Sequence, residues 1–380
     1  MPLFALALAL LGGCSNPPDS GIDDTATTEP DDGKLTFLTY NAGLADGFVP
    51  GAESRIPLVA AAISESDAEI VCLQEVWTPE QVAAVDMGAA DRFPHRAWPD
   101  ALQAADVGCQ DGEIDEMVDC LVDACDVTCV DEVVDCAFLS CALPFLGLPP
   151  DCMRCAFAHV GVDPVVAKDT CVDDPVEFAY GGSYGTGILS KYPIIQTDQI
   201  TFDSTTNRRG ATHAVIDAPD GPVDVYCTHL TAVFAVIPYP RDTGSWAEEQ
   251  LLQFDGLLDW MGTVAQTPHQ ALLGDLNSGP DGDGVTAQDP DGYDLLVADG
   301  FDVPYVDLDG RCTFCNDNPL IGGDDPEDNA LIDHVMLKGF TDYSATRAID
   351  GTVSADSCAV DLSVSAVSDH YGVSVTAALQ

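Results

Sequence analysis

Short apolar runs in this chain repeatedly meet a polar residue at one end, and this arrangement limits what the chain can fold into. Such runs are typical of buried strands. The polar residues at their ends are, in chain order, Asn41, Glu75, His229, Asp275 with Asn277, Asp333, and Asp369 with His370. Carboxylate, amide and imidazole groups at strand ends can converge on one place, which is how a metal-dependent hydrolytic site is built.

The spacing of apolar residues predicts an α/β protein. Strand patterns lie near residues 35–40, 70–74, 185–190, 213–217, 223–228, 271–275, 331–337 and 372–376. Helical spacing occurs over residues 55–66 and 246–261. The chain has 380 residues, of which 46% are hydrophobic, so it can form a large core. Because the polar set spans residues 41–370, we expect one catalytic domain with an insertion.

Residues 106–172 differ from the rest of the chain. They contain nine of the 15 cysteines, several of them four to seven residues apart, together with apolar residues at helical spacing. We expect a small helical insertion that is cross-linked by disulfides. The connectivity cannot be read from the sequence, but an odd number means that at least one of the nine pairs outside the segment or stays free.

Two features of this insertion allow alternative interpretations. Cys152 and Cys155 have the spacing of a zinc site, although a lone pair of this kind in an exported chain is a weak signal. Residues 143–150 form an apolar, proline-rich loop. This loop either packs between the cross-linked helices or contacts lipid or an apolar substrate.

The N-terminus indicates export. An apolar run over residues 3–13 ends at Cys14, and it is shorter than the roughly 20 residues that a membrane-spanning helix needs. It fits a secretory signal, and residues 11–14 resemble a bacterial lipobox, in which the cysteine receives a lipid. We therefore predict a lipoprotein-type signal over residues 1–14 and a disordered acidic tether over residues 15–33. The predicted location is the cell envelope, with secretion behind a plain signal peptide as the alternative.

The charge is strongly negative, with 64 acidic residues, 13 basic residues and a net charge of −51. Such a surface repels polyanions over about 10 Å at 0.1 M salt, and nucleic-acid binding normally uses Lys and Arg on phosphates. Nucleic acid is therefore a disfavoured partner. Residues 280–292 are similar to calcium loops but lack a glutamate at the twelfth position, so we expect a turn-rich acidic loop there.

The polar residues at the strand ends suit phosphoester chemistry. Glu75 is a good ligand for a hard cation, and Asn41 can add an amide oxygen or hold a phosphate oxygen. Asp275 and Asn277 are two residues apart, so both side chains point to the same side of an extended chain. One of them can then handle a proton while the other holds an oxygen. Asp333 can orient a histidine.

In order and spacing, these motifs resemble the endonuclease/exonuclease/phosphatase superfamily, which includes pancreatic-type deoxyribonuclease, inositol polyphosphate phosphatases and neutral sphingomyelinases. The matching stretches are residues 39–41, 72–76, 184–193, 228–230, 274–277, 332–334 and 368–370. The resemblance covers about residues 35–378 without the insertion. It implies a four-layer α/β sandwich over residues 34–380, in which two packed mixed β-sheets are flanked by helices.

The resemblance also implies roles for individual residues. Glu75 would be the principal Mg²⁺ ligand, with Asn41 and Asp369 nearby; Mn²⁺ and Ca²⁺ are alternative metals. The implied catalytic residues are His370 paired with Asp333 to activate or position water, His229 to stabilise the phosphate or protonate the leaving group, and Asp275 with Asn277 to orient the nucleophile. Arg209 would bind substrate. The general base differs across the superfamily, so it stays open here.

The resemblance therefore implies an exported, Mg²⁺-dependent phosphoric ester hydrolase. Residues 187–193, 228–232 and 249–251 are most similar to sphingomyelinase-like lipid phosphodiesterases, so a lipid substrate is favoured. A secreted endonuclease of the deoxyribonuclease type is the alternative, and a non-catalytic anchored binding module is a second one. The expected partners are the phosphoester substrate and the membrane, reached through a lipid on Cys14, and the expected state is a monomer.

Overall fold

A computed structural model describes residues 33–103, 107–235, 237–322 and 329–380. The predicted signal and all but the last residue of the predicted tether lie outside these ranges. The account below concerns the unit Gly33–Gln380. Within the described residues, no helix combines the length and the apolar character that crossing a membrane requires.

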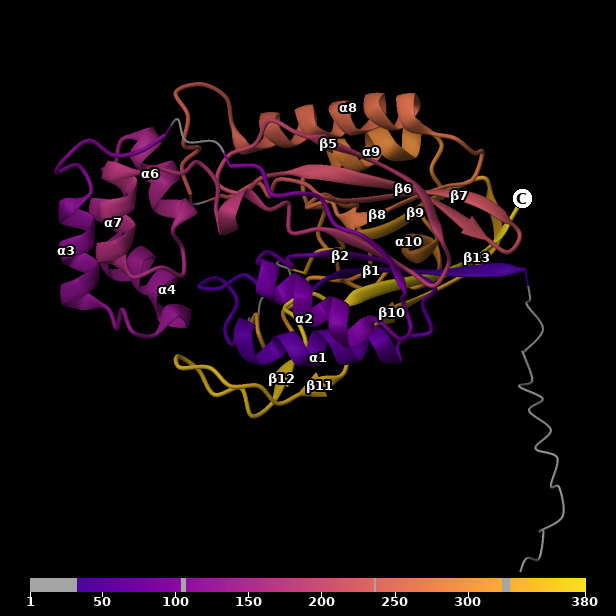
Figure 1. Ribbon diagram of the computed structural model, residues 1–380, viewed down its shortest axis with the longest axis horizontal. Coiled ribbons are helices and arrows are strands. Elements are labelled where there is room, and N and C mark those ends of the chain that lie inside the picture. Colours follow the sequence, from indigo (N-terminus) through magenta and orange to yellow (C-terminus); the bar gives the residue numbers. More distant parts are fainter. Residues whose placement is uncertain (1–32, 104–106, 236, 323–328) are drawn as a thin grey trace, which may run out of the picture. The chain divides into compact units, whose positions relative to one another are not determined.

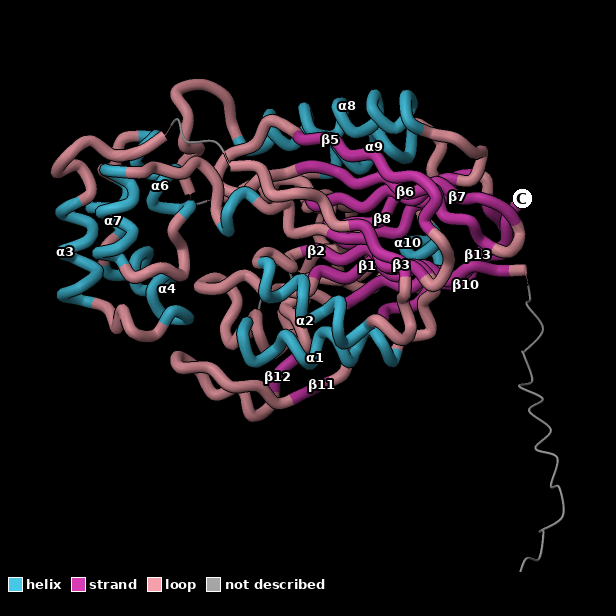
Figure 2. The backbone as a smooth tube through the Cα atoms, in the orientation of Figure 1, coloured by secondary structure: helices cyan, strands magenta, loops and turns pink. Residues whose placement is uncertain are grey.

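The first sheet has six strands in the order β10-β13-β1-β2-β4-β3 (Figures 1 and 2). The strands are β1 (Lys34–Asn41), β2 (Ile70–Gln74), β3 (His95–Ala97), β4 (Gly187–Ser190), β10 (Phe340–Ala348) and β13 (Gly372–Leu379). Strands β1 and β2 are parallel and all other neighbours are antiparallel. Because β1 and β2 run the same way, both carry their C-terminal residues to the same edge of the sheet.

The second sheet has five strands in the order β5-β6-β7-β8-β9. The strands are β5 (Ile194–Thr201), β6 (Gly210–Ala218), β7 (Gly221–His229), β8 (Gln270–Asp275) and β9 (Asp333–Lys338). Here β7 and β8 are the parallel pair. A separate small sheet pairs β11 (Thr352–Val353) with β12 (Ser365–Ala366).

Three apolar clusters hold the layers together. The largest lies between the two sheets and includes Phe37, Val225 and Val375. The second packs the outer face of the first sheet against α1 (Ala52–Glu65) and α2 (Pro79–Ala89), and the third packs the second sheet against α8 (Trp246–Val264) and α9 (Pro290–Ala298). The predicted four-layer sandwich of two mixed sheets flanked by helices is therefore confirmed (Figure 1).

The insertion is helical and cross-linked, as predicted. Its helices are α3 (Asp115–Ala124), α4 (Val130–Ser140), α5 (Ala142–Leu146), α6 (Pro150–Ala158) and α7 (Pro164–Asp173). Its disulfides are Cys109–Cys152, Cys120–Cys141, Cys125–Cys136 and Cys155–Cys171, and Cys129 pairs outside it with Cys358. Cys152 and Cys155, the pair with zinc-site spacing, are thus both in disulfides and cannot bind zinc as thiolates.

Two predicted loops differ in detail from the structure. Residues 143–150 are not all loop, because α5 covers Ala142–Leu146 with Pro144 in its first turn, where no intrahelical N–H bond is lost. In the acidic segment 280–292, turns and isolated bridges cover the first part and α9 begins at Pro290. Proline is favoured at the first helical position, which accounts for this start.

The disulfide Cys72–Cys227 joins β2 of the first sheet to β7 of the second and closes a sequence separation of 155 residues. Replacing both cysteines with alanine is expected to lower the free energy of unfolding by about 2 to 5 kcal/mol, because the unfolded chain regains the entropy of a long loop. Urea denaturation under non-reducing conditions measures this change. The matched control is removal of Cys312–Cys315, which spans three residues and should cost less. Equal losses would contradict the loop argument.

Two further elements complete the described unit. The short helix α10 (Pro304–Leu308) packs beside β9 and β10, and the 3₁₀ turn η1 (Tyr180–Gly182) precedes β4.

Candidate functional site

The ends of the central strands bring the predicted residues together. Asn41 ends β1 and pairs in register with Gln74, the residue before Glu75. In the second sheet His229 ends β7 directly beside Asp275 at the end of β8, and Asp333 begins β9 opposite Asp275. Packing of the two sheets places these ends at one site.

Asn41 lies at the centre of this site and is fully buried. Its Nδ2 donates to Asp275 Oδ2 at 2.9 Å and to Glu75 Oε1 at 3.2 Å. Its Oδ1 accepts a hydrogen bond from the backbone N–H of Gly43 at 3.0 Å. One amide therefore links a residue from each sheet and fixes the spacing between two carboxylates.

His370 and Asp333 form the predicted pair, with 2.8 Å between His370 Nδ1 and Asp333 Oδ2. Burial alone would lower the pKa of His370, but the charge of Asp333 and its hydrogen bond, with Asp369 and Asp275 adding to them, raise this pKa well above its ordinary value. Without a bound cation, the imidazole is therefore protonated at neutral pH. Its Nε2 faces the centre, 3.9 Å from Asp275 Oδ2.

His229 is the opposite case. Burial, together with the positive charges of Arg209 and His370, holds its pKa well below the ordinary value. Its Nε2 lies 3.2 Å from Asn277 Nδ2 and 3.4 Å from Asp275 Oδ2, while its buried Nδ1 has no partner among the described residues. The two imidazoles near Asp275 Oδ2 thus have pKa values shifted in opposite directions.

Two carboxylates at the centre are hard to ionise. Burial and the charge of Asp333 raise the pKa of Asp275 to about 7, even though the N–H of Asn277 donates to its Oδ1 at 2.9 Å. Burial and the charge of Asp369 raise the pKa of Glu75. An acid cluster of this kind is destabilised unless a cation joins it.

The residues present fit a divalent cation. Glu75 and Asp369 repel each other, and Gly43 leaves room beside them, since a Cβ there would lie 2.3 Å from Asp369 Oδ1. Asp275, Asp333 and His370 also offer ligand atoms within 4.8 Å of one another. Hard cations prefer oxygen ligands, so the Glu75 and Asp369 side of the site, which offers carboxylates alone, suits such a cation better.

Arg209 lies at the same site although it comes from the start of β6. It is 8% exposed, it interacts electrostatically with Glu75 and Asp275, and its guanidinium lies 5.9 Å from the ring centre of Trp77. Its Nη1 is buried without a partner among the described residues. An unpaired guanidinium N–H next to a predicted phosphate site is a suitable anion donor.

Two site residues have unusual backbone conformations. Glu75 has φ 56° and Asn277 has φ 47°, in the left-handed region that few non-glycine residues adopt. Glu75 directly follows β2 and Asn277 lies two residues beyond the end of β8, so the chain turns sharply at both strand ends. Such strain persists where the surrounding structure fixes it, and it concentrates at functional sites.

Arg55 was not predicted from the sequence, yet it holds two backbone segments of the site together. It is fully buried on α1 and donates to the carbonyl oxygens of Ala42 at 3.2 Å and Val367 at 3.0 Å, besides those of Gly43, Val49 and Pro50. It therefore ties the segment after Asn41 to the segment before Asp369. The available signal was an arginine at helical spacing with Val59 and Ile63, on the apolar face of the predicted helix.

Asn318 was missed for a different reason. Its Nδ2 donates to the carbonyl oxygens of Ser368 at 2.9 Å and Asp369 at 3.0 Å, and so holds the segment that carries His370. It lies in a polar loop without periodicity. No sequence pattern distinguishes it from the surrounding polar residues.

His334, to which the resemblance gives no role, faces away from the catalytic set. Its Nε2 lies 3.0 Å from the Ser278 carbonyl oxygen, and burial lowers its pKa to about 4. The unfolded chain, with a histidine pKa of about 6.5, takes up a proton that the folded protein excludes as the pH falls through this range. The free energy of unfolding therefore decreases as the pH is lowered from about 6.5 to about 4.

We expect His334 to lower the free energy of unfolding by about 2 kcal/mol between pH 7 and pH 5. Urea denaturation at both pH values should give a flatter pH dependence for His334→Gln, which keeps an N–H donor for Ser278 but does not titrate. The same pH dependence in both proteins would show that His334 titrates normally.

Several solved structures share this fold. Sphingomyelinase C from Streptomyces griseocarneus aligns with 18% identity and a TM-score of 0.56, covering 91% of this chain and 99% of that chain. A beta toxin variant from Staphylococcus aureus with bound magnesium ions aligns with 13% identity and a TM-score of 0.55, covering 90% and 99%. An endonuclease/exonuclease/phosphatase from Beutenbergia cavernae aligns with 18% identity and a TM-score of 0.53, covering 91% of this chain and 72% of that chain. At these identities the likeness establishes the fold alone.

A comparison with curated proteins found no match. The model of the Endonuclease/Exonuclease/phosphatase family matches residues 38–370. This span runs from β1 to His370 and includes every residue of the site described above. The chain therefore belongs to the Endonuclease/Exonuclease/phosphatase family.

Proposed function

We propose that this chain is an exported, Mg²⁺-dependent phosphodiesterase that hydrolyses a phosphocholine lipid such as sphingomyelin. The observation that carries the reaction type is the set of polar residues at the strand ends, where His229 Nε2 and His370 Nε2 lie 3.4 Å and 3.9 Å from Asp275 Oδ2. Family membership supports phosphoester hydrolysis. The magnesium ions of the beta toxin variant support the choice of metal, with Mn²⁺ and Ca²⁺ as alternatives to be tested.

The chain's own residues divide the chemistry between them. Asp275, with a pKa near 7, is suited to accept a proton from the attacking water at neutral pH. His370, through its Nε2, and Arg209 donate hydrogen bonds to phosphoryl oxygens, and Asn277 positions His229 beside the leaving group. A divalent cation at Glu75 and Asp369 would supply Lewis-acid polarisation of the phosphoryl group.

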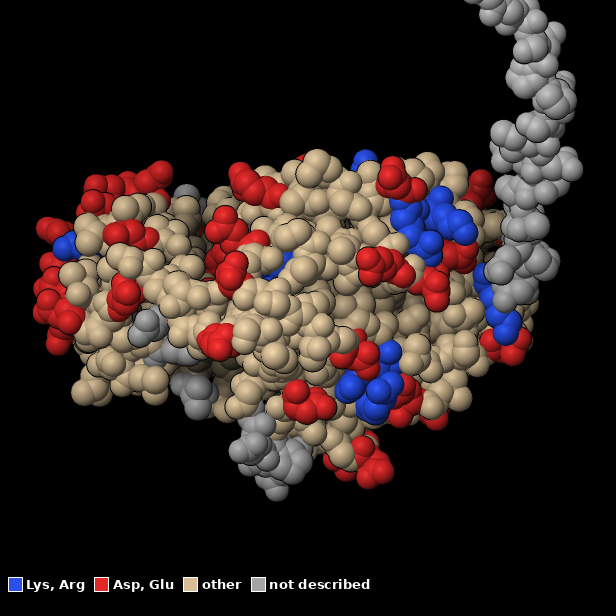
Figure 3. Space-filling model, turned by 90° about the horizontal axis from the view of Figure 1, so that it is seen from below, with Lys and Arg blue, Asp and Glu red and all other residues tan. Residues whose placement is uncertain are grey.

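The distribution of basic side chains favours a lipid over nucleic acid. Nine of the 13 Lys and Arg residues form ion pairs with carboxylates of residues that the structure describes. Figure 3 shows the result on one face, where the basic groups are few and lie beside acidic ones. A polyanion therefore meets little uncompensated positive charge, whereas a headgroup with a quaternary ammonium suits an acidic surface.

The test compares three substrates. The purified chain is assayed for phosphocholine release from sphingomyelin, for nicking of plasmid DNA and for hydrolysis of bis(p-nitrophenyl) phosphate, each with Mg²⁺, Mn²⁺, Ca²⁺ or EDTA. We expect metal-dependent hydrolysis, fastest on sphingomyelin. Faster cleavage of DNA would make the chain a secreted endonuclease, and no hydrolysis of any substrate would leave a non-catalytic binding module.

The location is also a proposal. Seven disulfides support export, because disulfides persist mainly in oxidising compartments. We propose that a lipid on Cys14 holds the protein at the cell envelope as a monomer. Labelled fatty acid should be incorporated into the exported chain and lost in Cys14→Ser. Absence of label in both would favour a secreted protein.

A further inference from the structure

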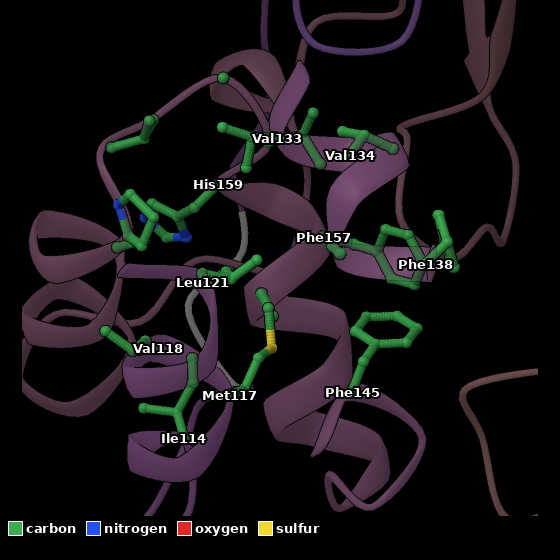
Figure 4. Close-up of a pocket in the computed structure, with 17 residues that line it drawn as sticks. Ile114, Met117, Val118, Leu121, Val133, Val134, Phe138, Phe145, Phe157 and His159 are labelled. Atoms are coloured by element: carbon green, nitrogen blue, oxygen red, sulfur yellow. The ribbon is translucent and has the colours of Figure 1, made fainter. Parts of the chain in front are cut away.

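The cross-linked insertion contains an apolar groove that the catalytic set does not use. Its free volume is about 70 Å³, and helices α3, α4, α5 and α6 supply most of its walls. Figure 4 shows Met117, Leu121, Phe138, Phe145 and Phe157 around it. His159 is the one described lining residue with a polar side chain, and its Nδ1 lies 2.9 Å from the carbonyl oxygen of Cys155. The groove therefore presents hydrocarbon surface.

Disulfides cross-link the helices that line this groove. Four of them cross-link the insertion internally, and Cys129–Cys358 ties α4 to the catalytic domain. An apolar cavity in a free helical bundle would lower its energy by collapsing, because unfilled space forfeits packing contacts. Cross-links at several points limit that relaxation.

The groove lies against the segment that continues from Asn41. A Cβ added to Gly47 would lie 2.8 Å from Val160 Cγ1 and 3.4 Å from Val134 Cγ2, and both valines line the groove. Asp131 on α4 accepts a hydrogen bond from the backbone N–H of Gly51 at 3.1 Å. The wall of the groove is therefore packed directly on a loop of the catalytic site.

Three large apolar side chains are exposed on the surface of the insertion. Leu139 and Leu143 are each 85% exposed, and Leu146 is 48% exposed. They neighbour Phe138 and Phe145, which line the groove. Large exposed apolar side chains grouped in this way mark interaction sites more often than chance exposure.

The charge of the insertion narrows the choice of ligand. Residues 106–172 contain 14 acidic residues and two basic ones, Arg154 and Lys168. Both basic residues are engaged in ion pairs, with Glu177 and Asp115 respectively. An insertion with this charge repels fatty acids, anionic lipids and nucleic acid, but not a zwitterionic lipid.

We infer that this groove binds a segment of one hydrocarbon chain of a zwitterionic phosphocholine lipid while the phosphodiester of that lipid lies at the catalytic site. The inference rests on the proposed function and adds to it the part of the molecule that recognises the lipid tail. The free volume is about half of the roughly 150 Å³ that admits benzene in an apolar cavity. The groove therefore accepts a few methylene groups.

The test fills the groove and leaves the catalytic site alone. Ala137 lines the groove on α4, so Ala137→Phe should block it. Ala124 is exposed at the end of α3 and is not part of the lining, so Ala124→Phe is the matched control. Two substrates are compared with each purified full-length protein: hexanoyl sphingomyelin, which has hydrocarbon chains, and p-nitrophenyl phosphocholine, which has the same headgroup without them.

Each methylene removed from water contributes about a fourfold preference. We therefore expect Ala137→Phe to lower kcat/KM for hexanoyl sphingomyelin by about 15- to 60-fold, as loss of two or three buried methylenes predicts. Its kcat/KM for p-nitrophenyl phosphocholine should stay at the wild-type value, which also shows that the variant is folded. Ala124→Phe should match wild type on both substrates. Equal loss on both substrates, or no loss on sphingomyelin, would overturn the inference.

A second measurement tests whether the groove binds hydrocarbon, independently of hydrolysis. Fluorescence of N-phenyl-1-naphthylamine, an uncharged apolar dye, reports binding without hydrolysis. Binding to wild type and Ala124→Phe but not to Ala137→Phe supports a hydrocarbon site, and absence of binding to wild type rejects it. If neither substrate is hydrolysed, the proposed function fails, and the dye result alone decides whether the groove binds hydrocarbon.

Discussion

Replacing Glu75 with Gln is expected to lower the metal-dependent rate of phosphodiester hydrolysis by roughly 10³-fold, because several kcal/mol of transition-state stabilisation depend on the bound cation. The amide keeps the shape of the side chain and its contact with Asn41 but removes the charge. Burial and Asp369 already raise the pKa of Glu75, so the metal-free protein carries an electrostatic cost there. Glu75→Gln should therefore raise the melting temperature in EDTA while it abolishes the further rise on adding Mg²⁺.

These opposite effects on activity and stability identify Glu75 as a ligand rather than as a structural residue. A structural role would lower the melting temperature in EDTA as well. Glu65→Gln is a suitable control, because Glu65 is exposed at the end of α1 and the substitution removes the same charge. An Mg²⁺-induced rise in melting temperature that survives in Glu75→Gln would move the metal to another part of the site.

His370→Ala is expected to lower kcat by about 10²- to 10⁴-fold, which is the usual contribution of a group that holds or moves a proton in the transition state. Asp333→Asn tests whether Asp333 raises the pKa of this histidine. Asp333 is the main cause that raises the pKa of His370, so its neutral replacement should lower that pKa. If protonated His370 is the active form, the loss of activity at high pH should move to lower pH in Asp333→Asn.

A full pH profile of kcat distinguishes this effect from simple misfolding, which would reduce activity at every pH without moving the profile. His269→Ala provides the comparison, because His269 precedes β8 at the end opposite Asp275. If the decrease of kcat at high pH occurs at the same pH in Asp333→Asn as in wild type, Asp333 positions His370 but does not raise its pKa.

The central strands of both sheets could be predicted from the sequence because they are buried on both faces. The run at residues 70–74 coincides with β2, which is buried at every position, and the predicted runs near 223–228 and 271–275 fall within β7 and β8. The strands β3, β5 and β10 were not predicted. They lie at sheet edges, where exposed positions carry polar residues, as in Gln196 and Gln199 of β5, and the apolar signal disappears.

Candidate site residues could be named for a related reason. A carboxylate, amide or histidine at the end of an apolar run is costly to bury without a function, so Glu75, His229 and His370 were recognisable in the sequence. Arg55 and Asn318 act through hydrogen bonds to backbone carbonyl oxygens far away in the chain. Those contacts leave no periodic pattern, so only the folded chain shows them.

The sequence by itself determined the α/β class, the order of the catalytic motifs, the cross-linked insertion and the acidic character that disfavours nucleic acid. These properties depend on local composition and spacing, which are present in any single stretch of the chain. Only the tertiary structure decided which imidazole has a raised pKa and which a lowered one, which residue pairs with Cys129, and that an apolar groove lies against the loop after Asn41. Each of these depends on distances between residues far apart in sequence, and such distances exist only after the two sheets and the insertion have packed.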